Sequence, residues 1–100
     1  MNASDNGLLD EFCDALWLED GLSRNTLESY RRDLRQFADW LTQRNDQTLT
    51  GATHADLLEF LAHKVSAKVK ASTTSRELSS FKRFYRYLLR QGKIQADPSL

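Results

Sequence analysis

The sequence predicts an all-α domain built from four helices. Of its 100 residues, 16 are Leu and 9 are Ala, whereas only 2 are Val and 1 is Ile. Helices favour Leu and Ala, and sheets favour β-branched side chains. Apolar residues also recur every three or four positions in four separate segments, which is the period of an amphipathic helix. Four Gly and one Pro supply few of the turns that a many-stranded fold requires.

The first helix is expected over residues 5–19. Leu8, Phe12 and Leu16 are four positions apart, so they share one helical face. Gly21 follows, and glycine is common just beyond a helix because it adopts the left-handed conformation without steric cost. Cys13 lies beside the apolar stripe, and we interpret it as a packed core thiol.

The second helix is expected over residues 23–43. Ser23 is a suitable N-cap because its hydroxyl can accept a hydrogen bond from a free backbone N–H of the first turn. Leu27, Leu34 and Phe37 belong to the apolar stripe that follows. The mostly polar stretch over residues 45–52 then predicts a loop.

The third and fourth helices are bounded by local signals as well. Thr53 opens the third, and Asp56 stands three residues later, close to the spacing of a capping box. The apolar pattern of this helix fades over residues 64–70. The fourth helix is expected over residues 73–91, and Gly92 is its predicted C-terminal stop.

The chain length predicts one domain with one modest core. We expect that domain over residues 1–96 and the start of a linker over residues 97–100, because Asp97-Pro98 disfavours a helix. No apolar run approaches the ~20 residues of a membrane span, and the N-terminus lacks the features of a signal peptide. One cysteine excludes an internal disulfide, and we expect a cytoplasmic protein.

Charge is balanced overall but distributed unevenly. The chain has 14 basic and 14 acidic residues, yet residues 1–20 contain six acids and no Lys or Arg. Residues 64–93 hold nine basic residues and one acid, Glu77. Such an uneven distribution of charge is typical of a protein in which the basic part of the chain faces a polyanion such as nucleic acid. A solvated, polarised surface has the same pattern.

We expect no catalytic, cofactor-binding or metal-binding residues in this chain. His54 and His63 are nine positions apart, so they do not share a helical face as metal ligands would, and we interpret both as surface residues. No glycine-rich phosphate loop and no Ser/His/Asp arrangement occurs in the sequence. A self-sufficient enzyme is therefore not predicted.

Two predicted helices carry polar stripes suited to DNA. On each helix, Arg or Lys alternates with small hydroxyl residues, which would allow close approach while the cations meet phosphates or guanine edges. The polar residues at each helix start would also favour phosphate. An ordinary solvated basic face remains the alternative. The candidates are Ser23, Arg24, Asn25, Thr26, Ser29, Arg32, Thr73, Arg76, Ser79, Lys82 and Arg83.

The order of these residues resembles a known family. Two motifs, followed by Asp97-Pro98, are similar to the N-terminal core-binding domain of the tyrosine recombinases, the phage-integrase family. The motifs are Ser23-x-x-Thr26-x-x-x-Tyr30-x-x-Asp33-Leu34-x-x-Phe37-x-x-Trp40-Leu41 and Thr73-x-x-Arg76-x-Leu78-Ser79-x-x-Lys82-x-Phe84-Tyr85-x-Tyr87-Leu88. A further set of residues looks most like the D-type branch of the Xer subgroup: Asp14-Ala15-Leu16-Trp17-Leu18-Glu19, with Asn25-Thr26-Leu27 and Tyr30-Arg31-Arg32-Asp33-Leu34. The resemblance extends from about Leu8 to Pro98.

The resemblance implies a four-helix, SAM-like orthogonal bundle that forms half of a clamp around double-stranded DNA. It implies a longer protein in which a catalytic domain follows the linker and carries a tyrosine nucleophile. That recombinase would resolve chromosome dimers at a dif-like site, together with a C-type partner recombinase and neighbouring protomers in a tetrameric synapse. Because the catalytic domain is absent from this sequence, we expect the chain to bind DNA weakly and to cut nothing.

A protein-interaction module is the rival hypothesis. A small bundle with an acidic first helix and a basic last helix could associate head to tail and mediate oligomerisation. The two hypotheses overlap, because neighbouring protomers of a synapse must touch. In that case Asp10 and Asp14 on the acidic helix would contribute to the contact.

Overall fold

The computed structural model describes residues 3–100 and contains four main helices. Helix α1, Ala3–Ala15, continues as a π-helical turn, η1, Leu16–Asp20. Helix α2 spans Arg24–Asn45, and a short 3-10 helix, η2, spans Leu49–Gly51. Helices α3, His54–Ser66, and α4, Ala71–Arg90, complete the bundle. No strand occurs in the described range, so the all-α prediction is confirmed.

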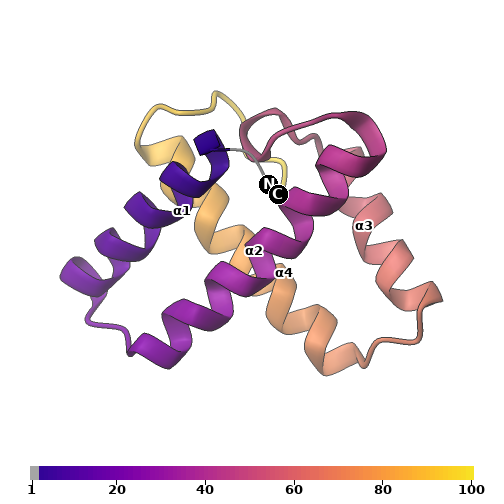
Figure 1. Ribbon diagram of the computed structural model, residues 1–100, viewed down its shortest axis with the longest axis horizontal. Coiled ribbons are helices and arrows are strands. Elements are labelled where there is room, and N and C mark those ends of the chain that lie inside the picture. The colour runs from indigo at the N-terminus through magenta and orange to yellow at the C-terminus, as the bar shows by residue number, and fades with distance from the viewer. Residues whose placement is uncertain (1–2) are drawn as a thin grey trace.

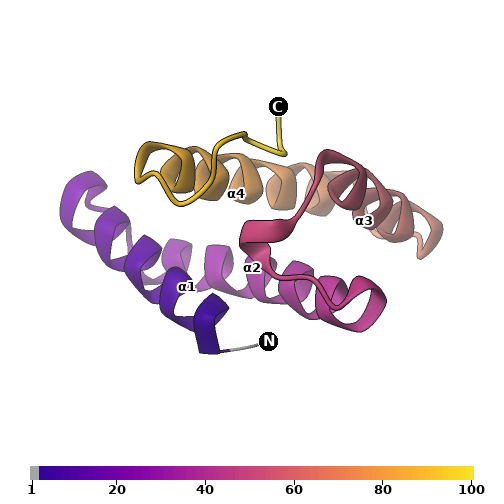
Figure 2. The same ribbon diagram turned by 90° about the horizontal axis from the view of Figure 1, so that it is seen from above.

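The helices form two hairpins stacked in two layers. Helices α1 and α2 make one layer, and α3 and α4 make the other (Figure 2). In Figure 1, α2 and α4 cross in the middle of the molecule like the strokes of an X, with α1 on one side and α3 on the other. This arrangement places α2 and α4 in contact at the centre, where they make most of the inter-layer packing.

Most of the predicted caps are confirmed. Ser23 Oγ accepts a hydrogen bond from Thr26 N at 3.2 Å, so Ser23 is the N-cap of α2. Thr53 and Asp56 form a reciprocal capping box at the start of α3, with N···O distances of 3.1 and 2.9 Å. Gly21 adopts the left-handed conformation with φ 63°, as expected for a residue that ends a helix.

The boundaries differ from prediction where no side chain marks them. Helix α4 begins at Ala71, two residues before the predicted start at Thr73, and its N-cap Lys70 makes no side-chain capping bond. Helix α2 runs to Asn45 rather than residue 43, and Asp46 in the left-handed conformation ends it. The last turn of the first helix is π-helical, a local widening that apolar periodicity alone does not specify.

The core has two aromatic clusters, one on each side of the α2–α4 crossing. Toward α1, Phe12 packs against Phe84 at 5.2 Å and against Tyr87 at 5.5 Å between ring centroids. Toward α3, Phe37 packs against Phe81 at 5.0 Å and against Phe60 at 5.1 Å. Because α2 and α4 contribute to both clusters, they join the two halves of the bundle.

The C-terminal segment packs against the bundle. The carbonyl oxygen of Pro98 lies 2.9 Å from Nδ1 of His54, and Pro98 and Ser99 are both buried. His54 is itself exposed, as predicted. The division into a domain over residues 1–96 and a linker from residue 97 stays a prediction, and residues 1 and 2 lie outside the described range. Within that range, no helix is long and apolar enough to cross a membrane.

Candidate DNA-binding surface

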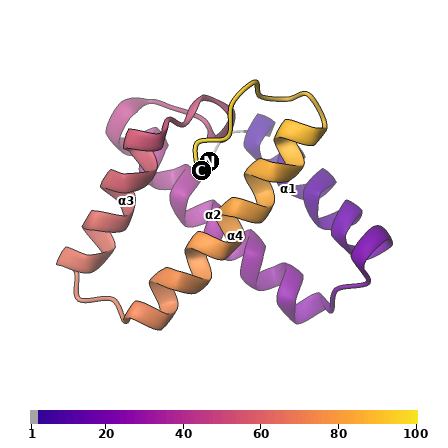
Figure 3. The same cartoon turned by 180° about the vertical axis from the view of Figure 1, so that it is seen from behind.

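The N-terminal ends of α2 and α4 lie on the same edge of the molecule. Figure 1 and the opposite view in Figure 3 both place these two helix starts along the lower edge, below the crossing. A helix N-terminus carries partial positive charge and free backbone N–H groups, and both favour phosphate. The fold therefore places on one edge, at the two lower ends of the crossing, two segments around residues 23–26 and 71–76 that are far apart in the sequence.

The predicted residues of α2 follow this edge with different exposures. Arg24, Asn25 and Arg32 are exposed, whereas Thr26 and Ser29 are half-buried. Ser23 is exposed, but its hydroxyl already caps the helix and lies 2.9 Å from Thr26 Oγ1. Arg24 and Arg32, like Arg35 farther along α2, are therefore exposed cations that a polyanion can reach.

The predicted residues of α4 form a stripe along the helix. Ser79 and Lys82 are exposed, and Thr73 is half-buried. Arg86 and Arg90, which are not among the predicted DNA contacts, are exposed and continue the stripe at helical spacing. Contact with DNA stays a prediction for every one of these residues.

Arg76 already forms hydrogen bonds to another side chain of the protein. Its guanidinium donates from Nη2 to Asp33 Oδ1 at 2.8 Å and from Nε to Asp33 Oδ2 at 3.3 Å. Asp33 is 1% exposed and also accepts a hydrogen bond from the buried Ser80 hydroxyl at 3.0 Å. The Arg76 side chain remains 46% exposed, so one edge of the guanidinium still reaches the surface.

Arg83 has a different kind of partner. Its Nη2 donates to Asp20 Oδ2 at 2.5 Å, and its guanidinium lies 6.0 Å from the centre of the Tyr30 ring. The hydrogen bond to Asp20 raises the pKa of Arg83 above its ordinary value, so this side chain stays charged. Both partners are partly exposed, 32% for Arg83 and 41% for Asp20, and solvent screens such a pair.

The burial of Asp33 could have been predicted from the sequence. Asp33 lies three residues after Tyr30 and four before Phe37, which places an acid on the apolar face of α2. Glu77 likewise lies four residues before Phe81 on α4 and is 1% exposed. Buried acids at such positions indicate internal partners, but the sequence does not reveal which residues those are.

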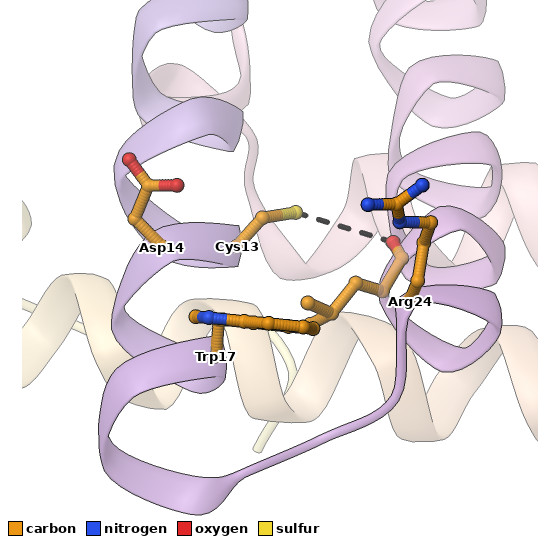
Figure 4. Close-up of a pocket in the computed structure, with 5 residues that line it drawn as sticks. Cys13, Asp14, Trp17 and Arg24 are labelled. Atoms are coloured by element: carbon orange, nitrogen blue, oxygen red, sulfur yellow. Dashed lines mark hydrogen bonds between the residues drawn. The ribbon is translucent and has the colours of Figure 1, made fainter.

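A shallow pocket lies beside the start of α2. Cys13, Asp14, Trp17, Arg24 and Leu27 line a volume of about 270 Å³ (Figure 4). The Cys13 thiol points toward the carbonyl oxygen of Leu27, 4.0 Å away, and burial raises its pKa. Cys13 is therefore a packed thiol, as predicted. No group of three or more His, Cys, Asp or Glu side chains that could hold a metal ion occurs in the described part of the chain.

Comparison with known proteins identifies relatives of this bundle. Residues 9–92 match the family model for the phage integrase N-terminal SAM-like domain. The tyrosine recombinase XerD of Pseudomonas aeruginosa is 46% identical over 100 residues, which cover the whole chain and 33% of the relative. XerD of Yersinia pestis is 42% identical over 99 residues, and XerD of Ralstonia nicotianae is 45% identical over 91 residues. The chain spans about a third of the length of these curated relatives.

Proposed function

Because this chain belongs to the phage integrase family through its N-terminal SAM-like domain, we propose that it binds double-stranded DNA as part of a site-specific tyrosine recombinase. In this proposal the recombinase cuts and rejoins a dif-like site to resolve chromosome dimers at cell division, acting in the cytoplasm with a C-type partner. This chain supplies the DNA-binding role. The name shared by its relatives, tyrosine recombinase XerD, supports the assignment.

One structural observation carries the DNA-binding role. The starts of α2 and α4 share an edge, and exposed cations and hydroxyl groups line the stripes that continue from it. Backbone N–H groups, cations and hydroxyls are the groups that position a protein on phosphates, and arginines between them can reach base edges. The neutral net charge is compatible with binding, because the six acids of residues 1–20 are separate in sequence from these stripes and just one of them, Asp20, is shown paired with a stripe residue, Arg83.

We expect this chain to bind a dif-like duplex more tightly than a scrambled duplex, and to do so in a salt-sensitive manner. With about four phosphate contacts, the affinity should fall about a hundredfold between about 50 and 200 mM salt, because bound cations release counterions from DNA. Fluorescence anisotropy at several salt concentrations measures both effects.

Two variants make this experiment specific. Arg32→Gln removes an exposed cation of the proposed surface and should lower the slope of log affinity against log salt by about one. Arg44→Gln removes another exposed cation, near the other end of α2, where Arg44 pairs with Glu59 at 3.2 Å, and should leave the slope unchanged. Equal slopes for both variants, or no binding of the parent chain at low salt, would count against the DNA-binding role.

A contact between neighbouring protomers is a second role that the surface favours. Trp17 and Leu18, in the acidic η1 turn, are 53% and 80% exposed. At the other end of the longest dimension, 37 Å, the turn between α3 and α4 carries an apolar groove of about 330 Å³ lined by Val65, Val69 and Leu78 among others. Residues 60–76 contain four basic residues and no acid. The two ends are therefore complementary in charge and in apolar character, as a head-to-tail contact requires.

We expect this chain to self-associate weakly through these two ends. Leu18→Lys and Val65→Lys should each abolish the concentration-dependent rise in mass measured by sedimentation equilibrium. An equimolar mixture of the two variants should form dimers, since one intact head and one intact tail remain. Leu58→Lys, at an exposed leucine of α3 outside both surfaces, is the control. Asp10 is a weaker candidate for this contact than predicted, because it already pairs with Arg31 at 2.6 Å.

A monomeric parent chain at about millimolar concentration would argue against this contact, because useful weak interfaces have dissociation constants near that range. Association that survives Val65→Lys but not Leu18→Lys would indicate a symmetric interface through η1 instead. Either result leaves the DNA-binding role unaffected, because the measurement contains no DNA.

A further inference from the structure

Arg76 and Arg83, two arginines of the α4 stripe, each pair with an aspartate, but the two pairs differ in their setting. The carboxylate of Asp33, the partner of Arg76, is 1% exposed, and the buried Ser80 hydroxyl also donates to it. The carboxylate of Asp20, the partner of Arg83, is 41% exposed. A fully desolvated carboxylate cannot exchange its partner for water without a large cost, whereas an exposed one can. The first pair is therefore a fixed part of the fold, and the second can open.

The Asp33–Arg76 pair joins the two helices of the proposed DNA surface. Asp33 lies on α2, and both Arg76 and Ser80 lie on α4. A guanidinium that donates two parallel hydrogen bonds to one carboxylate fixes direction as well as distance. Because α2 and α4 cross (Figure 1), this contact restricts both the sliding and the rotation of one helix against the other.

The residues next to the pair in sequence are candidates for DNA contact. Arg32 precedes Asp33 on α2 and is exposed, and Ser79 precedes Ser80 on α4 and is exposed. A shift of α4 relative to α2 would change the separation of these two surface residues. Arg76 itself already uses two donors, Nε and Nη2, on Asp33. Bidentate reading of a guanine also needs two donors, so while the pair is intact only the outer Nη1–Nη2 edge of Arg76 is left for DNA.

We propose that Asp33 and Arg76 act as positioning residues, which set the relation between α2 and α4 so that both stripes meet one DNA duplex together. This inference rests on the proposed DNA-binding function and reassigns Arg76 from base contact to support. Ser80 contributes the third hydrogen bond of the same network.

The decisive variants are two Asp→Asn changes, each at the partner of one arginine. Asp33→Asn should weaken binding to a dif-like duplex by about tenfold, within the range observed for residues of one network. Asp20→Asn should leave affinity unchanged or raise it, because it frees Arg83 at the surface. If Arg76 were instead a direct DNA contact that Asp33 restrains, Asp33→Asn would also raise affinity. The sign of the change at Asp33 therefore separates the two roles.

Two further readouts separate positioning from a general loss of structure. Binding is measured well below the melting temperature of each variant, and the ratio of affinity for dif-like and scrambled duplexes is recorded. Positioning predicts that this ratio falls in Asp33→Asn, because base contacts depend on alignment more than phosphate contacts do. Arg76→Lys should have the same effect as Asp33→Asn, and the double variant should be no worse than either single one.

The helix arrangement can also be measured without DNA. Residual dipolar couplings of backbone amides should show a changed orientation of α4 relative to α2 in Asp33→Asn, with α2 and α4 each intact. Should Asp33→Asn fail to fold, Ser80→Ala removes only one hydrogen bond to Asp33 and should give a smaller change in the same direction. An unchanged orientation in the folded variant, or unchanged or tighter DNA binding, would overturn the positioning role. Failure of the parent chain to bind DNA would overturn the proposed function instead.

Discussion

Replacing Lys64 by Ala is expected to lower the free energy of unfolding by about 3–5 kcal/mol, the range for a buried charge left without its partner. Lys64 Nζ lies 3.4 Å from Glu77 Oε1, and the side chain of Glu77 is only 2% exposed. The other carboxylate oxygen of Glu77 is buried with no hydrogen-bond partner among the described residues. Lys64 is thus the cation that compensates this carboxylate, and its removal leaves a charge that water cannot reach.

Substitution of the partner, Glu77, should have a very different effect on the free energy of unfolding. Glu77→Leu removes the buried charge itself and fills its place with apolar volume, so the free energy of unfolding should stay the same or rise. Lys64 keeps a hydrogen bond to Gln36 Oε1 at 2.7 Å and is 16% exposed, so its ammonium can still reach water. The two variants should differ in stability because Glu77 is buried more deeply than Lys64.

Urea denaturation followed by circular dichroism measures both changes. Arg44→Ala is the matched control, because Arg44 and Glu59 are both more than half exposed and an exposed pair contributes about 1 kcal/mol or less. Similar losses for Lys64→Ala and Arg44→Ala would contradict the assigned role of Lys64. A strongly destabilised Glu77→Leu would show that the carboxylate itself stabilises the bundle.

The local features of the fold could be predicted because short stretches of sequence determine them. Ser23 and Thr53 act as N-caps through hydrogen bonds to residues three positions away, and Gly21 ends a helix through its own conformation. The π-helical turn at Leu16–Asp20 was not predicted, because apolar periodicity does not specify a local widening of a helix.

The candidate site was predictable as two helical stripes but not as a network. The spacing of hydroxyl and basic residues placed Ser79 and Lys82 on one face of α4, where both are exposed. The spacing did not show that Arg76 pairs with Asp33, 43 residues earlier. Nor did it show that Arg83 pairs with Asp20, 63 residues earlier. Those partners are set by how α2, α4 and η1 pack, and a single sequence carries no record of that packing.

The second large effect is expected from Phe81→Ala, which should lower the free energy of unfolding by about 3–5 kcal/mol. Phe81 is fully buried, and its ring lies 5.0 Å from that of Phe37 and 5.9 Å from that of Phe60. It therefore joins α2, α3 and α4 in the cluster on the α3 side of the crossing. Removing it leaves a cavity that the two remaining rings cannot close without shifting the helices.

Phe81→Ala should lower the stability of the whole bundle and not only that of the α3 side. Helices α2 and α4 continue into the cluster around Phe12 and Phe84, and a domain of this size normally unfolds in one cooperative step. Far-ultraviolet circular dichroism and Trp fluorescence of Phe81→Ala should consequently give one shared transition at a lower urea midpoint. Leu58→Ala, at a side chain that is 53% exposed, should stay within about 0.5 kcal/mol of the parent chain. Two separate transitions in Phe81→Ala would show instead that α3 can detach while α1, α2 and α4 remain folded, and that the crossing does not couple the two clusters.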